Sequence, residues 1–203
     1  GILLEYPTMS GHGLAFVIAP RSGHPGALPS PQLGLFNETS NGKPTHHVYA
    51  VELDTFHSKE FNDINNNHVG IDINGLNSTQ AKPAGYYSND NGIFQNLTLI
   101  SGKAMQVWVD YDGTAKHISV TLAPIYAGKP NKPLLSLSYD LSPILNKNMY
   151  IGFSSSTGSV PTSHCLLGWS FKMNGVAQGL DLSQLPKLPR NGPKEKSKVL
   201  TIG

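Results

Sequence analysis

Short apolar or alternating runs recur along almost the whole chain, and they limit the possible folds more than any other feature of the sequence. Each run has the length of a strand, and clusters of Gly, Pro, Asn and Ser separate the runs. Regularly spaced strands without helical stretches between them predict an all-β antiparallel jelly-roll sandwich rather than a parallel α/β sheet. The predicted strands are residues 14–18, 48–54, 69–73, 95–100, 105–111, 118–122, 134–139, 149–154 and 166–173.

Charge divides the chain of 203 residues into two parts. The net charge is +2, but residues 186–203 contain five basic residues and one acid, so the remainder carries −2. A body with this charge is not expected to bind nucleic acid. We therefore predict one domain over residues 1–185 and a basic tail over 186–203. No run approaches the ~18 apolar residues of a membrane span.

The richest cluster of polar, metal-ligating residue types lies in residues 48–74. Alternation within a strand places Glu52 and Asp54 on one face, with Val51 and Leu53 directed into the core. Asp63 follows in a loop, and His68 opens the next predicted strand. Carboxylates suit Ca²⁺, and carboxylates with an imidazole suit Mn²⁺ or a similar ion, so the spacing indicates an adjacent pair of metal sites. The same spacing is equally typical of an exposed strand face with a histidine at a strand end and no metal.

Three Asn-x-Thr sequons stand at Asn37, Asn77 and Asn96. Such triplets are acceptors for N-linked glycans in secreted and cell-surface proteins. They predict glycosylation at these asparagines and a location on the extracellular face of the plasma membrane or outside the cell.

Several ordered segments together resemble the legume (L-type) lectin domain, and most closely the extracellular domain of plant L-type lectin receptor kinases. These segments are 11–20, 33–36, 48–74, 105–111, 152–158 and 168–171. The resemblance implies a jelly roll with a flat back sheet and a curved front sheet. It also implies that the domain begins earlier than this chain does, so the fold is expected to be incomplete at its N-terminus.

The resemblance further implies a Mn²⁺ and a Ca²⁺ beside a sugar-binding cleft. Glu52 and His68 match the transition-metal ligands, Asp54 and Asp63 match the bridging carboxylates, and the Phe56 carbonyl matches a calcium ligand. Ser58 stands where the family has an asparagine that binds calcium and sugar. Because a neutral hydroxyl is a poorer calcium ligand than an amide oxygen, calcium binding is expected to be weakened.

The sugar-contacting positions of the family are also changed. His12 replaces an aspartate that accepts two sugar hydroxyls, whereas a neutral imidazole has one acceptor. The loop glycine that donates its N–H to the sugar falls at Ser30 or Pro31, and proline has no N–H. Ser159 and Val160 occupy the last specificity loop, and Phe56 and Ser58 complete the expected cleft. The monosaccharide site is therefore predicted to be degenerate.

These features predict a non-catalytic binding domain of a receptor kinase, attached to the membrane only through the longer parent chain. The expected partner is a glycan, a cell-wall component or a small anionic ligand, with two copies pairing through the back sheet. A soluble secreted lectin-like protein is the main alternative, and a jelly-roll glycoside hydrolase is a further one. A hydrolase needs two carboxyl groups ~5–9 Å apart on one face. The next position on that face after Asp54 is Phe56, and Glu60 already lies in the loop.

Overall fold

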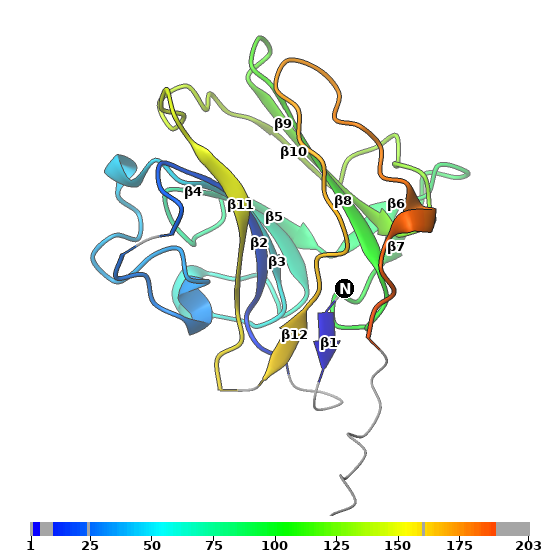
Figure 1. Cartoon of the computed structure of the whole chain (residues 1–203), viewed down its shortest axis with the longest axis horizontal. Coiled ribbons are helices and arrows are strands. Elements are labelled where there is room, and N and C mark those ends of the chain that lie inside the picture. Colours follow the sequence, from blue (N-terminus) through cyan, green and yellow to red (C-terminus); the bar gives the residue numbers. More distant parts are fainter. Residues whose placement is uncertain (1, 5–9, 24, 160, 190–203) are drawn as a thin grey trace, which may run out of the picture.

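The computed structural model describes residues 2–4, 10–23, 25–159 and 161–189, and within them the chain is almost entirely β-structure. Two antiparallel sheets face each other (Figure 1). The larger has the strand order β11 (Tyr150–Ser156), β2 (Gly13–Ala19), β3 (Tyr49–Asp54), β4 (His68–Ile73) and β5 (Gln80–Pro83). The smaller has the order β10 (Leu135–Ser138), β9 (His117–Pro124) and β8 (Met105–Asp112). The predicted antiparallel sandwich is confirmed.

Short elements complete the described fold. Strand β6 (Gly85–Tyr87) pairs with β7 (Phe94–Asn96), and β1 (Ile2–Leu4) pairs with β12 (Thr162–His164). The helical elements within the described residues are four 3-10 turns: η1 (Ser30–Gln32), η2 (Pro44–His46), η3 (Lys59–Phe61) and η4 (Leu182–Gln184). No helix in this part of the chain is long and apolar enough to cross a membrane. Residues 190–203, which make up most of the predicted basic tail, lie outside the described residues.

Alternation along β3 and β4 divides the buried residues between the two faces of the larger sheet. Tyr49, Val51 and Ile71 face the smaller sheet and pack in one core with residues of β9 such as Val120. Ala50 faces the opposite side, in a second core beneath the loops. Glu52 and Asp54 follow Ala50 at intervals of two residues and therefore share its face. The sheet that builds the main core thus also presents both carboxylates on its other side.

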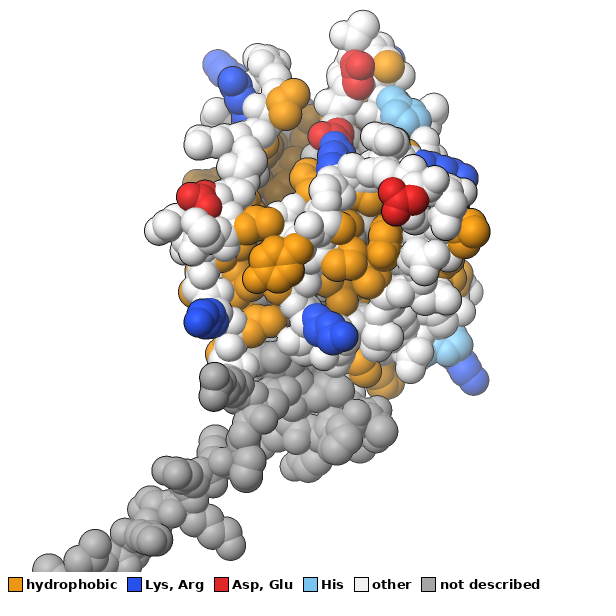
Figure 2. Space-filling model, turned by 90° about the vertical axis from the view of Figure 1, so that its right-hand side faces the viewer, with side chains coloured by type: hydrophobic (Ala, Val, Ile, Leu, Met, Phe, Trp, Pro, Cys, Tyr) orange, Lys and Arg blue, Asp and Glu red, His pale blue; other side chains and the backbone are white. Residues whose placement is uncertain are grey.

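The segment 166–173 corrects one prediction. Its alternating pattern predicts a strand, but it forms none, because it has no ladder partner among the described residues. Trp169 instead packs edge-on against Phe153 of β11, with ring centroids 5.5 Å apart. Trp169, Phe171 and Met173 remain substantially exposed, as does Val107 of β8. Hydrophobic side chains gather on the face seen from the right of Figure 1 (Figure 2).

We predict that Ile71→Ala lowers the free energy of unfolding by about 2–5 kcal/mol, because it leaves a cavity in the main core. Ile93→Ala is the matched control, since Ile93 is 57% exposed and its substitution opens no buried cavity. Urea denaturation of both variants measures the difference. Equal losses for the two variants would contradict the placement of Ile71 in the core.

Candidate functional site

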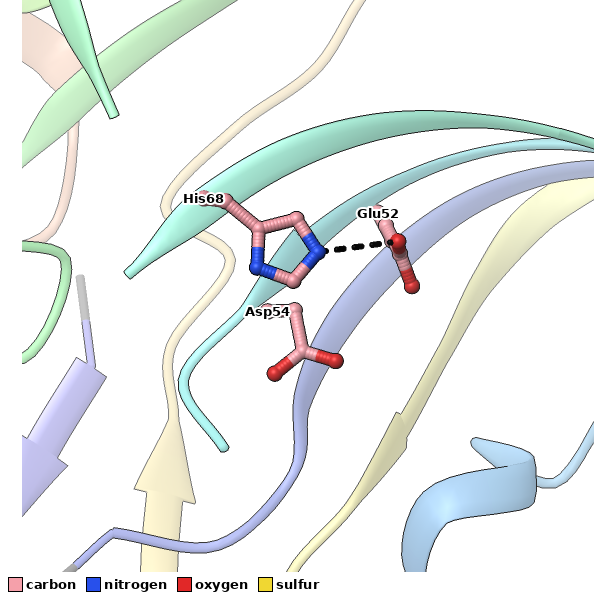
Figure 3. Close-up of side chains that lie close together, drawn as sticks. All are labelled: Glu52, Asp54 and His68. Atoms are coloured by element: carbon pink, nitrogen blue, oxygen red, sulfur yellow. Dashed lines mark ion pairs between the residues drawn. The ribbon is translucent and has the colours of Figure 1, made fainter. Parts of the chain in front are cut away.

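Two neighbouring strands bring Glu52, Asp54 and His68 together at one end of the larger sheet. Strands β3 and β4 are antiparallel, and their register places Asp54 directly opposite His68. One ligand atom from each of the three side chains lies within 4.8 Å of the other two, and all three residues are buried. Figure 3 shows the imidazole ring facing Glu52, with Asp54 beside both. Residues predicted as ligands from their spacing therefore converge in the fold.

Hydrogen bonding fixes the orientation of His68. Its Nδ1 lies 2.8 Å from the backbone carbonyl oxygen of Asn65, which can only accept, so Nδ1 carries a proton. Its Nε2 faces Oε1 of Glu52 at 3.3 Å. A neutral imidazole would direct a lone pair from Nε2 at a carboxylate oxygen, which is unfavourable. A proton or a metal cation between these atoms removes the repulsion.

The pKa values of the cluster reflect the opposing effects of burial and of nearby charges. Burial favours the neutral form of His68, but the nearby Glu52 carboxylate outweighs burial and leaves the imidazole pKa above its ordinary value. Burial and the Glu52 carboxylate raise the pKa of Asp54 to about 8, although the Phe56 N–H donates to its Oδ1 at 2.5 Å. Without a cation, therefore, the site retains protons that an exposed carboxyl group would lose.

Ser78 and Asp72 extend the cluster into the interior, and the sequence pattern did not single out either residue. The Ser78 hydroxyl lies 2.7 Å from both Glu52 Oε1 and Asp72 Oδ1. One hydroxyl proton serves only one carboxyl group, so the other contact requires a protonated carboxyl group. Burial, followed by repulsion from Glu52, raises the pKa of the fully buried Asp72. The Asp72 carboxyl group is thus harder to ionise than an exposed one.

Gly70 makes room for this arrangement. It lies opposite Glu52 in the register of β3 and β4. A Cβ atom at this position would lie 2.1 Å from Ser78 Oγ and 2.5 Å from Glu52 Oε1. Only glycine lets the buried carboxylate and hydroxyl approach so closely.

Asp63 takes a different place from the other three predicted metal ligands. Its Oδ2 accepts the Ser58 N–H at 2.6 Å, and it is not a member of the group of three. Burial, followed by the Ser58 hydrogen bond in the opposite sense, leaves the pKa of Asp63 above its ordinary value. Asp63 therefore closes the loop that contains η3. The Ser58 hydroxyl beside it is buried and has no hydrogen-bond partner among the described residues.

The residues predicted to line a ligand cleft gather at the same end of the sheet. The His12 ring packs on Phe56 with centroids 4.4 Å apart, and Phe56 is 45% exposed. A Cβ atom on Gly158 would lie 2.7 Å from the His12 ring and 3.7 Å from Ser30 Oγ. The structure thus brings together His12, Ser30 and Phe56 beside Gly158. Ser159 follows at an exposed position, and Val160 lies outside the described residues.

His12 is held firmly by its backbone while one ring nitrogen stays without a partner. Its N–H donates to the Ser156 carbonyl at 3.0 Å, and its carbonyl accepts from the Thr55 N–H at 3.4 Å. The ring is largely buried, and Nδ1 has no hydrogen-bond partner among the described residues. Burial lowers the pKa of His12, so the imidazole is neutral near pH 7. It therefore offers one donor and one acceptor rather than a positive charge.

Comparison with known proteins agrees with the sequence resemblance. The family model described as "Legume lectin domain" matches residues 2–187. The L-type lectin-domain containing receptor kinase IV.2 of Arabidopsis thaliana is 56% identical over 199 residues, which are 98% of this chain and 29% of that protein. Lectin II from Ulex europaeus has a TM-score of 0.60 at 28% identity, over 78% of this chain and 62% of that one. The lectin from Bauhinia forficata, solved with GalNAc, has a TM-score of 0.60 at 27% identity, over 79% of this chain and 64% of that one.

We predict that Mn²⁺ raises the thermal midpoint of the metal-free protein and that Glu52→Gln abolishes this shift. At 100 times the dissociation constant, a ligand that binds only the folded state contributes about 2.7 kcal/mol. Differential scanning fluorimetry with and without Mn²⁺ measures the effect. Glu38→Gln is the control, because Glu38 is an exposed carboxylate outside the cluster. The same metal shift in the Glu52→Gln and Glu38→Gln variants would exclude Glu52 as a ligand.

Proposed function

The chain belongs to the legume lectin domain family, and from that premise we propose that it is the glycan-binding, non-catalytic extracellular domain of a receptor kinase. The observation that carries the proposal is the convergence of a buried Glu52–Asp54–His68 cluster and the contacting His12 and Phe56 rings at one end of one sheet. The resemblance to legume lectins implies a Mn²⁺ and a Ca²⁺ at this place. The closeness of these two groups of residues supports a metal site beside a ligand-binding surface.

The donor set of the cluster fits a transition-metal ion. Two carboxylates and an imidazole whose Nδ1 is already engaged form the mixed oxygen and nitrogen set that suits Mn²⁺. We infer that Glu52 and His68 hold this ion, that Asp54 and Asp63 also contact Ca²⁺, and that the Phe56 carbonyl completes the calcium ligands. A bound cation would supply the positive charge that offsets buried carboxylates. Ser58 contributes a neutral hydroxyl, so we expect calcium to bind more weakly than manganese.

The cleft supports binding of an unusual ligand. We infer that it consists of His12, Ser30, Phe56, Ser58 and Ser159, with Val160 at its edge. Aromatic and apolar surface from Phe56 lies beside the His12 imidazole, which can donate through one ring nitrogen. The Bauhinia forficata lectin is solved with GalNAc, which makes a glycan the first ligand class to test. The His12 imidazole can donate a hydrogen bond where the family's aspartate can only accept. This change favours complex glycans, cell-wall components or small anionic ligands over glucose or mannose.

Binding accounts for the site better than hydrolysis does. A jelly-roll hydrolase needs an acid and a nucleophile that reach the substrate from one face. Glu52 and Asp54 share a face, but both are buried and held by His68, Ser78 or the Phe56 N–H. This arrangement suits the retention of a cation more than proton transfer to a sugar.

The relationship to a longer protein supports the proposed context. The chain spans 29% of the length of the receptor kinase IV.2 relative. We infer that the domain lies on the extracellular face of the plasma membrane, with residues 186–203 leading from domain 1–185 toward the rest of the parent. A secreted lectin-like protein would have the same domain, and the sequence of the complete transcript separates these two contexts. We further infer that two copies pair through the back sheet, and sedimentation velocity tests whether the protein is a dimer.

We predict that the unmodified protein shows no detectable binding to mannose or glucose, and that His12→Asp combined with Ser58→Asn creates it. Each hydrogen bond to a charged partner contributes about 1.5–3 kcal/mol, and millimolar affinity corresponds to only about 4 kcal/mol. A glycan array and a nucleotide titration of both proteins provide the measurement. His117→Asp with Ser119→Asn, on the distant strand β9, controls for the substitutions themselves. Strong mannose or glucose binding by the unmodified protein would refute the proposed cleft.

A further inference from the structure

The three sequons differ in what their asparagine side chains do in the folded chain. Asn37 is partly buried, whereas Asn77 and Asn96 are exposed. We propose that Asn77 and Asn96 carry N-linked glycans and that Asn37 stays unmodified, because its carboxamide holds a surface loop together. The proposal rests on the proposed function only in assuming that the natural protein enters the secretory pathway.

The modification replaces a hydrogen on the asparagine amide. The Nδ2 atom attacks the anomeric carbon of an oligosaccharide carried on a lipid pyrophosphate. A C–N bond forms, the C–O bond to the pyrophosphate breaks, the amide gives up one proton, and the lipid pyrophosphate leaves. The asparagine must therefore place Nδ2 in solvent, with room for a bulky, hydrated sugar chain in the final fold.

Asn37 does not meet this requirement. Its Nδ2 donates to the Gly26 carbonyl at 3.0 Å, which joins two parts of the loop eleven residues apart. A Cβ atom on Gly26 would lie 3.4 Å from Nδ2, so the amide nitrogen faces the loop backbone at close range. One of the two Nδ2 hydrogens is thus engaged by the loop backbone, and a sugar on this nitrogen would have to fit beside Gly26.

The carboxamide oxygen of Asn37 is also occupied. Oδ1 accepts from the Thr39 N–H at 3.0 Å, from the Thr39 hydroxyl at 2.8 Å and from the Ser40 N–H at 2.9 Å. The Ser40 hydroxyl returns the interaction by accepting the Asn37 N–H at 2.8 Å. The sequon threonine is therefore part of the same turn. This reciprocal network follows directly after the buried Phe36 and contains the buried Ser40.

Asn77 and Asn96 lie in different surroundings. Asn77 occupies the turn between β4 and β5, and Asn96 is the last residue of β7. Neither carboxamide has a hydrogen-bond partner among the described residues. The sequon threonines Thr79 and Thr98 are exposed as well. A glycan at either asparagine would extend into solvent and break no contact of the described fold.

Site occupancy tests the proposal directly. The full chain, secreted from eukaryotic cells behind an added signal peptide, would be treated with an N-glycanase that converts glycosylated Asn to Asp. Peptide mass spectrometry then reads each sequon separately. We expect conversion at Asn77 and Asn96 and unmodified Asn at position 37. Conversion at Asn37, or no conversion at Asn77 and Asn96, would overturn the proposal.

The thermal stability of protein made without glycans tests the structural role of Asn37 separately from sugar transfer. In protein made without glycans in bacteria, we expect Asn37→Gln to lower the thermal midpoint by about 2–4 °C. Asn77→Gln and Asn96→Gln are matched controls and should leave it unchanged. Asn37→Asp keeps the acceptor oxygens and loses only the donor to Gly26. Its thermal midpoint should also fall, and this variant replaces Asn37→Gln in the test if Asn37→Gln does not fold.

The two sets of results are independent of ligand recognition. An unchanged midpoint in both Asn37 variants would overturn the structural role even if the glycan array fails for unrelated reasons. Conversely, loss of glycan binding by the whole protein would refute the proposed function without changing site occupancy or stability.

Discussion

The burial of acidic groups on the strands of one sheet is the constraint on which the site depends. Glu52, Asp54 and Asp72 are all nearly inaccessible, and removing a carboxylate from water costs several kcal/mol unless a partner offsets it. The structure offsets this cost in three ways. Burial raises the pKa of the Asp72 carboxyl group, the Ser78 hydroxyl joins Asp72 to Glu52, and the His68 imidazole faces Glu52. A cation at the same place would replace the protons.

Strand alternation connects this constraint to the fold. Val51 and Ile71 face the smaller sheet, whereas Ala50 faces the loops, and Glu52 and Asp54 share the face of Ala50. The pairing of β2 with β3 sets Gly13 opposite Asp54, so the turn before β2 brings His12 next to Thr55 and Phe56. The main core therefore fixes the distance between the cluster and the cleft. A change in strand register would separate them.

The sequence predicted those features that depend on local pattern and missed those that depend on distant partners. Alternation identified β2, β3, β4, β8 and β9, and it placed Glu52 and Asp54 on one face. It failed for residues 166–173, whose pattern is that of a strand but which lack a neighbouring strand in the described fold. Ser78 was missed because its role comes from contact with Asp72 and Glu52. The spacing between these residues in the sequence carries no signal of such contact.

A crystal structure of protein grown with Mn²⁺ and Ca²⁺, with diffraction recorded at the manganese absorption edge, tests the central claim most directly. The account predicts an anomalous peak bounded by Glu52, Asp54 and His68, with Nε2 of His68 as the nitrogen ligand. It also predicts that the His12 and Phe56 rings stay in contact beside that peak. A peak elsewhere, or a well-ordered site with no anomalous peak between Glu52 and His68 at saturating Mn²⁺, would contradict the account.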